Sequence, residues 1–350
     1  MGKRKLAIAA GVIAGGLPLL PVKAFTFSGR TAIITGGSRG LGFALAENLL
    51  KENANVTLLA RDAAELQKAE TQLRQRTSRG QILIIPCDVT QPEQLAQAFQ
   101  QAQSRFDRLD LLINNAGSIS VGPFETMEAD DFDAELNLQL HAVVQGIRLA
   151  LPAFRRLKEG RIINISSIGG AVSIPHMSSY CAAKFALAGL SETVTAELAP
   201  ENIKVTTVYP GLMRTGSPIQ AVFKGNHEKE YGWFASGDVL PGLSVSADYA
   251  AQRIIEASRD GETQVRFPWV TQMGILGHAL LPETYALIMR LVARFMPKGF
   301  SKERMTGEQS RAWLAGWNAN SGINPSRALN VLRKQSGIRA VKWTLTSIWV

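Results

Sequence analysis

The strongest constraint on the fold is a regular alternation of short β-branched runs with longer amphipathic segments, which begins near residue 30. The short runs are apolar throughout, a pattern typical of strands that helices cover on both faces. Repeated strand–helix units predict a parallel sheet with helices on each side. The seven expected strands span residues 31–35, 55–60, 81–88, 109–115, 160–166, 203–210 and 263–268. We therefore expect one α/β domain with a doubly wound, seven-stranded parallel sheet.

Composition divides the chain into four parts. We expect a hydrophobic anchor or signal-like segment over residues 1–27 and the catalytic α/β domain over 28–270. Residues 271–300 are apolar and helical in pattern, with basic residues near their end, and are expected to pack on the domain or to lie on a membrane. Residues 301–350 are basic and rich in polar residues, which is typical of a poorly ordered tail.

The N-terminus combines three basic residues, Lys3 to Lys5, with 17 uncharged residues from Leu6 to Val22. That length is near the lower limit for a spanning helix, and the pattern also fits a cleaved secretory signal or a soluble tail. Pro18 and Pro21 would break the last turns. We expect an uncleaved anchor or interfacial helix that binds a membrane surface. The leading basic residues favour a domain outside the cytoplasm, but we expect a cytoplasmic catalytic domain, because its expected cofactor is a cytoplasmic metabolite.

The net charge of +9 is concentrated at the two ends of the chain. Residues 1–30 contain five basic residues and no acid, and residues 298–350 contain nine basic residues against two acids. This distribution argues against nucleic-acid binding by the central domain and favours attraction of the ends to an anionic membrane. The two cysteines, Cys87 and Cys181, provide neither a disulfide framework nor a metal site.

A glycine-rich loop, TGGSRGLG at residues 35–42, joins the first expected strand to a helix. Glycines at 36, 40 and 42 permit a tight turn and allow backbone N–H groups at the helix N-terminus to approach a pyrophosphate. A simple strand-to-helix connection would also use glycines. The position of the loop in the first βα unit favours dinucleotide binding.

Several motifs in order resemble those of the short-chain dehydrogenase/reductase family. The resemblance rests on the glycine loop, Asn114–Gly117, Asn137, Ser167, Tyr180 with Lys184, and Pro210–Gly211, and it covers roughly residues 28–270. It implies a Rossmann-type sheet, a nicotinamide dinucleotide, hydride transfer at a carbonyl or alcohol carbon, and a homo-oligomer. The residues that it implies for cofactor binding are Gly36, Ser38, Arg39, Gly40, Leu41, Gly42, Arg61, Asp88, Val89, Asn115, Ala116, Gly117, Tyr180, Lys184, Pro210, Gly211 and Thr215. Asp88 could equally be a loop cap at a strand end.

Charge near the second expected strand favours NADP over NAD. An acid there would bind a ribose 2′-hydroxyl, whereas basic groups accommodate a 2′-phosphate. Arg61 follows the strand and Arg39 lies in the glycine loop, so two guanidinium groups can converge on a phosphate. Asp62 is the competing residue, because a shift of one position would put an acid at the site.

Tyr180 and Lys184 are four residues apart, so on a helix they are neighbours. Such a pair could be a snorkelling surface pair. Hydride transfer to a ketone also needs an acid with a pKa brought toward neutrality, and the charges of a nearby ammonium and of an oxidised nicotinamide would favour the phenolate. The resemblance gives this role to Tyr180, with Lys184 also on the nicotinamide ribose. It implies that Ser167 holds the substrate oxygen and that Asn137 holds a water that connects Lys184 to solvent; an ordinary solvent-facing Asn137 is the alternative.

The substrate is expected to be a small lipophilic carbonyl or alcohol compound. A long segment after Pro210–Gly211 predicts a lid over the substrate. Its Met213, Phe223, Trp233 and Phe234 favour an apolar pocket, although the aromatic residues could equally pack the lid itself. Ser167, His176 and Tyr180 are the expected substrate-pocket residues. A second function class is a catalytically silent dinucleotide-binding protein that acts as a redox sensor or assembly factor. No metal site is expected.

Overall fold

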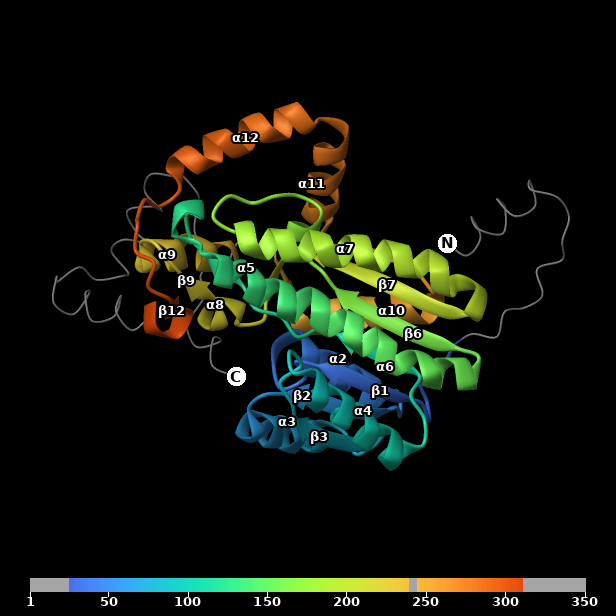
Figure 1. The fold of residues 1–350 in the computed structure, drawn as a ribbon. Helices are drawn as coiled ribbons and strands as arrows, with labels where there is room; N and C mark the ends of the chain where they lie inside the picture. Colours follow the sequence, from blue (N-terminus) through green and yellow to red (C-terminus); the bar gives the residue numbers. More distant parts are fainter. Residues whose placement is uncertain (1–24, 239–243, 311–350) are drawn as a thin grey trace, which may run out of the picture.

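A seven-stranded parallel sheet forms the centre of the molecule (Figure 1). The structure is a computed structural model and describes residues 25–238 and 244–310. The order of the strands is β11-β7-β6-β4-β1-β2-β3. Their bounds are β1 (Thr31–Thr35), β2 (Asn55–Ala60), β3 (Ile82–Pro86), β4 (Leu111–Asn114), β6 (Gly160–Ile165), β7 (Ile203–Pro210) and β11 (Gln264–Phe267).

This sheet confirms the predicted fold class. Each of the seven expected strands is present, and three of them have the expected bounds: 31–35, 55–60 and 203–210. The other four are shorter than expected by one or more residues at one or both ends. The continuous apolar runs are explained by burial on both faces: Ile33 and Ile34 are adjacent in β1, are fully buried, and belong to separate apolar clusters on opposite sides of the sheet.

Helices cover both faces of the sheet. One face is covered by α2 (Gly40–Lys51), α3 (Ala63–Arg76) and α10 (Ala247–Asp260), which share one apolar cluster. The other face is covered by α4 (Pro92–Phe106), α6 (Ala142–Leu157) and α7 (Ser178–Leu198), which share the second. Helix α5 (Ala129–Leu136) continues into α6 through a π-helical turn, η2 (Asn137–His141). Three short 3₁₀ turns also occur: η1 (Phe124–Thr126), η3 (Ile168–Gly170) and η4 (Ala199–Glu201).

The segment after β7 forms a separate layer near the carboxyl edge of the sheet (Figure 1). It contains β8 (Leu212–Arg214), α8 (Ser217–Gln220), β9 (Val222–Phe223) and α9 (His227–Asp238). Strand β8 pairs with β10 (Ser244–Ser246), and β9 pairs with both β5 (Ser120–Val121) and β12 (Met305–Thr306). Residues from three distant parts of the chain therefore meet in the β5-β9-β12 sheet.

Two further helices follow the last strand of the main sheet. Helix α11 (Trp269–Leu280) and helix α12 (Pro282–Phe295) are bent by 117° relative to each other. Within the described residues, no single helix has the length and apolar character to cross a bilayer; only the bent α11–α12 pair meets those two criteria together. The expected N-terminal anchor and most of the 301–350 tail lie outside the described residues, although 301–310 returns to the domain and forms β12.

Candidate active site

The candidate active site lies at the carboxyl edge of the sheet, where the strand order reverses between β1 and β4. In parallel α/β sheets a ligand binds in the crevice at such a switch point. Loops from four strands meet at this edge: 36–39 after β1, 115–117 after β4, 166–167 after β6 and Gly211 after β7. They contain most of the residues that the sequence predicted for cofactor and substrate.

The glycine loop after β1 makes a turn that side chains would block. Gly36 has a φ of 66°, in the region that favours glycine. A Cβ on Gly42 would lie 2.2 Å from the carbonyl oxygen of Gly36, so only glycine permits this approach. The N-cap of α2 is Arg39, and it makes no side-chain capping hydrogen bond. The first backbone N–H groups of α2 therefore remain available to an anion.

The loop after β4 is fastened to the glycine loop. The Asn115 side-chain amide donates to the carbonyl oxygens of Thr35 and Gly36, both at 3.0 Å. The Thr35 hydroxyl accepts from the backbone N–H groups of Asn115 and Ala116, also at 3.0 Å. Asn115 thus holds the two loops together through side-chain contacts.

Two basic residues lie beside the expected adenosine end of the site. Arg61 is exposed at the end of β2. Arg39 is half exposed and pairs with Glu65 at 2.6 Å, and Glu65 also accepts from the Ser38 hydroxyl at 3.1 Å. Asp62 caps α3, because its carboxylate accepts from the backbone N–H groups of Ala64 and Glu65. Asp62, the acid that the sequence offered as an alternative to Arg61, therefore serves as the N-cap of α3.

The remaining expected cofactor residues are spread along the same edge. The Asp88 carboxylate accepts from the backbone N–H and the hydroxyl of Thr90, as a loop cap does, and Val89 is buried in the core. Gly211 donates its N–H to the Phe267 carbonyl. Thr215 lies directly against Gly40, 3.5 Å from the point where a Cβ on that glycine would be. The segment after β7 therefore reaches the glycine loop.

These residues fit a dinucleotide. The glycine turn would bring backbone N–H groups to a pyrophosphate, and Arg39 and Arg61 would contact the adenosine ribose. A bound nicotinamide dinucleotide would supply or accept the hydride and, when oxidised, would add positive charge beside Tyr180. The residues that would position and protonate the reacting oxygen are Tyr180 and Lys184.

Tyr180 and Lys184 lie one turn apart on α7 and are both buried, with relative exposures of 8% and 5%. The Lys184 ammonium donates to the carbonyl oxygen of Ile165 at 2.8 Å, and it lies 5.8 Å from the centre of the Tyr180 ring. The Ser167 hydroxyl accepts from the Gly169 N–H at 3.0 Å and lies close enough to Tyr180 to act on the pKa of that phenol. The neighbouring Ser166 instead donates to the Lys184 carbonyl. The structure thus brings Ser167, Tyr180 and Lys184 together.

Groups of the protein alone do not lower the pKa of Tyr180. Burial raises the pKa of Tyr180 well above its usual value; the hydrogen bond with Ser167 acts to lower it, and the charge of Glu135 acts to raise it further. Burial lowers the pKa of Lys184 to about 8, and Glu135 opposes that shift. The expected shift of the tyrosine pKa toward neutrality also depends on the positive charge of an oxidised nicotinamide, so it stays a prediction.

The expectation for Asn137 is not met. Its side chain is exposed, whereas the buried amide in this region belongs to Gln139, two residues later. A Cβ on Gly117 would lie 3.5 Å from Oε1 of Gln139 and 3.7 Å from Nζ of Lys184. That Oε1 atom is buried and has no hydrogen-bond partner among the described residues. The π-helical turn shifts the helical register here, which a regular helical period does not predict.

Glu135 is a buried carboxylate that the sequence did not single out. It accepts from the hydroxyls of Ser118 and Ser120 at 2.8 Å and from the side-chain amide of Gln139. Glu135 and Gln139 are four residues apart, so their spacing was the available signal. Their burial depends on packing against α7.

His176 faces the segment after β7 (residues 212–238), which the sequence predicts to be a lid and which is called the lid below. Its Nδ1 lies 2.8 Å from the carboxylate of Glu230 on α9, and the Trp233 indole donates to the same carboxylate at 2.6 Å. Glu230 is fully buried. Beside this link, Met177, Tyr180 and Cys181 pack with four partly buried apolar residues, Ile119, Ile174, Trp233 and Phe234. The surroundings of Tyr180 are therefore largely apolar.

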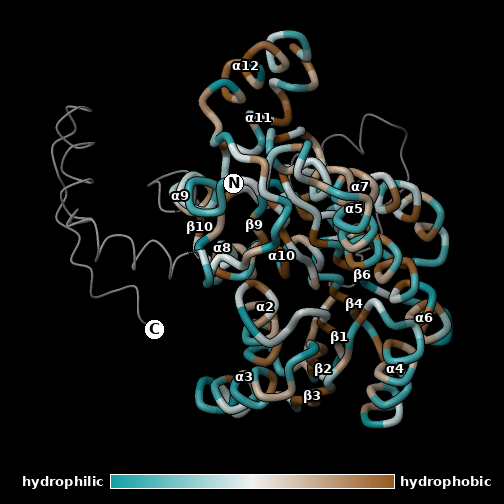
Figure 2. The backbone as a smooth tube through the Cα atoms, turned by 60° about the vertical axis from the view of Figure 1, so that its left-hand side comes forward, coloured by the Kyte–Doolittle hydropathy of each residue, from teal (hydrophilic) through white to brown (hydrophobic). Residues whose placement is uncertain are grey.

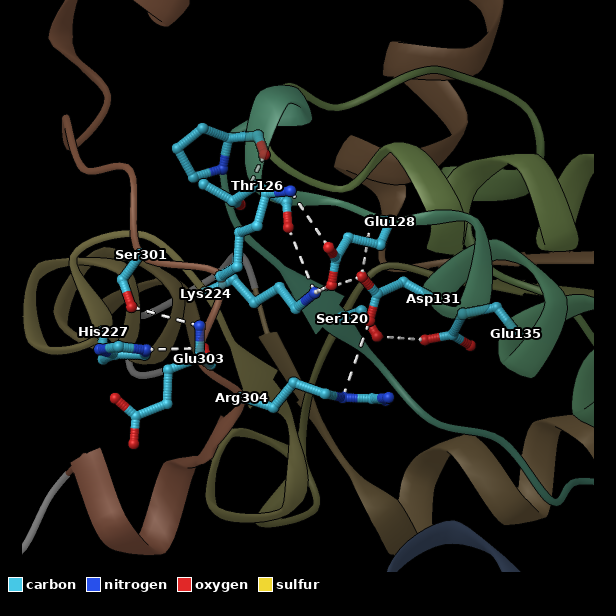
Figure 3. Close-up of polar contacts among 12 residues, drawn as sticks. Ser120, Thr126, Glu128, Asp131, Glu135, Lys224, His227, Ser301, Glu303 and Arg304 are labelled. Carbon is cyan, nitrogen blue, oxygen red and sulfur yellow. Dashed lines mark hydrogen bonds and ion pairs between the residues drawn. The ribbon is translucent and has the colours of Figure 1, made fainter.

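A buried ion pair between Lys224 and Asp131 fastens the residue that follows β9 to helix α5 (Figure 3). The Lys224 ammonium contacts the Asp131 carboxylate and the Thr126 carbonyl, and Arg304 approaches Asp131 from the other side at 3.7 Å. Burial acts to raise the pKa of Asp131, but the Glu128 N–H and the Lys224 charge outweigh it and hold that pKa below its usual value. The pair joins β9, α5 and the returning 301–306 segment.

The chain is similar to several proteins with oxidoreductase names. The short chain dehydrogenase family matches residues 30–222. The chain is 37% identical to the oxidoreductase BOA17 of Botryotinia fuckeliana, over 53% of this chain and 68% of that one. It is 35% identical to the D-beta-hydroxybutyrate dehydrogenase of Rhizobium meliloti, over 57% and 80%, and 36% identical to the fatty acyl-CoA reductase of Acinetobacter baylyi, over 53% and 63%.

A solved structure agrees with these similarities. The L-sorbose reductase of Gluconobacter frateurii, complexed with NADPH and L-sorbose, superposes with a TM-score of 0.62 and 26% identity, over 69% of this chain and 96% of that one. The family match covers more than half of the chain and includes the glycine loop, the Asn114–Gly117 loop, Ser167, Tyr180 and Lys184. The chain therefore belongs to the short-chain dehydrogenase/reductase family and is an oxidoreductase that uses a nicotinamide dinucleotide.

Proposed function

We propose that this enzyme transfers hydride between NADP(H) and a carbonyl or secondary alcohol carbon of a lipophilic compound. The observation that carries the proposal is the buried group of Ser167, Tyr180 and Lys184, which lies beside an apolar wall. Ser167 and Tyr180 would hold the substrate oxygen between two hydroxyl groups. In the reducing direction Tyr180 donates the proton that the developing alkoxide needs, and Lys184 stabilises the resulting phenolate.

Charge supports NADP as the cofactor. Arg61 is exposed at the end of β2 and Arg39 is half exposed at the N-cap of α2, whereas one carboxylate oxygen of Asp62 is occupied by capping α3. Guanidinium groups bind phosphate by charge-assisted hydrogen bonds. The sorbose reductase with a similar fold is described in complex with NADPH, which agrees with this choice.

The apolar wall supports a lipophilic substrate. Ile119, Ile174, Trp233 and Phe234 surround the segment that contains Tyr180, and the buried Glu230 carboxylate beside them is engaged by His176 and the Trp233 indole. Apolar pockets bind by removing apolar surface from water. One relative is named as a fatty acyl-CoA reductase, and a fatty acyl group is lipophilic. We further propose that the protein is membrane-associated, because the basic excess lies at the chain ends. We propose a cytoplasmic catalytic domain because its cofactor is a cytoplasmic metabolite, and a homo-oligomer because of the family resemblance.

An NADPH-consumption screen tests the proposal. Purified full-length protein in detergent is given ketones and aldehydes of increasing chain length, with NADH in parallel reactions. We expect turnover with NADPH that improves with chain length. Faster turnover with NADH would refute the NADP assignment, and a preference for short polar sugars would refute the lipophilic class.

A catalytically silent dinucleotide-binding protein is the competing function. It predicts NADPH binding, seen as a change in cofactor fluorescence, without turnover across the whole panel. The presence of Ser167, Tyr180 and Lys184 in one buried group favours the enzyme.

A further inference from the structure

Helices α11 and α12 form a hairpin that carries an unusual amount of exposed apolar surface. The 14-residue α12 has no buried residue. Leu280, Leu287, Leu291 and Phe295 are exposed by 68%, 61%, 54% and 86%. Figure 1 shows α12 standing off the domain, and Figure 2 shows the brown, hydrophobic colour of the hairpin in a second view. A contiguous apolar surface of this kind marks a contact with another apolar body.

The apolar surface lies beside a basic one. Arg290, Arg294 and Lys298 are exposed, and none of them pairs with a carboxylate among the described residues. Glu283, in the first turn, is the one acidic residue of α12. Exposed leucine and phenylalanine next to unpaired arginine and lysine is the arrangement by which a helix binds the interface of an anionic membrane.

We propose that the α11–α12 hairpin docks on an anionic lipid membrane, with the apolar face of α12 in the interface. The bend of 117° suits helices that lie at a surface. This contact is separate from any contact that the N-terminal segment makes.

Charge argues against the two other bodies that could cover this face. Residues 311–350 contain six basic residues and no acid, so this segment is repelled by the basic end of α12. A second copy of the chain would add the same three basic residues and only one acid, Glu283, so the contact would keep a net positive charge. An anionic lipid surface complements the charge and the apolar residues together.

The hairpin is attached to the loop that follows Ser167. Ile275 of α11 packs with Val172 and Tyr209, and the Tyr285 hydroxyl donates to the Ser173 carbonyl at 2.7 Å. Docking would therefore bring the loop that follows Ser167 close to the lipid. Direct uptake of substrate from the lipid would follow only if the proposed function is correct. Docking of the hairpin on the membrane does not depend on the proposed function.

Fluorescence of a labelled residue tests the contact at the hairpin itself. In the full chain, Leu291→Cys carries a polarity-sensitive fluorophore; Cys87 and Cys181 are buried and leave the label on position 291. Gln67→Cys on α3, at the far end of the molecule from α12 in both views, is the matched control. Vesicles contain phosphatidylcholine with or without phosphatidylserine, and a second set has nitroxide-labelled acyl chains.

We expect anionic vesicles to shift the emission at position 291 to the blue, and the nitroxide lipids to quench it, with neither change at position 67. Arg290→Gln with Arg294→Gln should raise the phosphatidylserine requirement about tenfold. Flotation in a density gradient shows separately whether the protein binds the vesicles. The proposal fails if the protein floats with the vesicles while the nitroxide lipids do not quench the label at position 291, because the N-terminus alone would then bind. It also fails if the emission is already blue without lipid in dilute monomer, which would indicate cover by residues 311–350. A blue shift that follows protein concentration and a dimer in light scattering would indicate a second copy. None of these measurements requires turnover.

Discussion

The Lys184 ammonium donates to the Ile165 carbonyl at 2.8 Å and lies 5.8 Å from the centre of the Tyr180 ring, so the end of β6 holds the lysine beside the tyrosine. This contact ties the catalytic helix α7 to the strand that precedes Ser167. The end of β6 and one turn of α7 thus position Ser167, Tyr180 and Lys184.

Removal of the tyrosine hydroxyl should abolish turnover. We expect Tyr180→Phe to lose at least about a hundredfold in activity, because general acid catalysis typically contributes that much or more. Steady-state NADPH oxidation measures the loss, and a fluorescence titration should find NADPH affinity unchanged. Retention of a tenth of the activity would mean that another group supplies the proton.

Neutralisation of Glu135 should move the pH profile of alcohol oxidation to lower pH. The charge of Glu135 raises the pKa of both Tyr180 and Lys184, so Glu135→Gln lowers both and the deprotonated tyrosine forms at lower pH. The profile of kcat/KM against pH measures the shift. Asp133→Asn, an exposed carboxylate on the same helix, is the control and should leave the profile in place. A shift to higher pH would contradict the assignment.

Release of Arg39 should strengthen NADPH binding. Glu65 engages both Arg39 and Ser38, so Glu65→Gln frees them for the 2′-phosphate and removes a like charge. Because the pair is exposed, we expect a gain of up to about fivefold. Fluorescence titrations with NADPH and with NADH measure the two affinities, and the affinity for NADH should not change. Weaker NADPH binding in this variant would place the phosphate elsewhere.

Loss of the buried carboxylate at Asp131 should destabilise the lid. Asp131→Asn removes the nearest carboxylate from the buried Lys224 ammonium, which keeps only the half-exposed Glu128 at 3.6 Å, at a cost of about 3 kcal/mol. Urea unfolding measures the loss, and limited proteolysis should cut residues 222–238 faster. Since the folded chain lowers the pKa of Asp131, the stabilisation is present above the unfolded pKa and is lost as pH falls through the folded one. Equal stability of Asp131→Asn and Asp133→Asn would contradict this role.

The sequence by itself determined the sheet, the order of its elements and the glycine loop. These features follow from local patterns: β-branched runs of strand length, glycines at 36, 40 and 42 directly after a strand, and a Tyr–Lys pair at helical spacing. Strands 31–35, 55–60 and 203–210 needed no tertiary information, because their apolar runs end where turn residues begin.

Only the tertiary structure decided which polar residues enter the site and which surfaces remain open. The π-helical turn buries Gln139 and leaves Asn137 in solvent, which a regular helical period cannot predict. His176 contacts Glu230, 54 residues away, because the lid folds back over α7. The apolar pattern of residues 282–295 predicted a helix but not its exposure, since exposure depends on what the rest of the chain leaves uncovered.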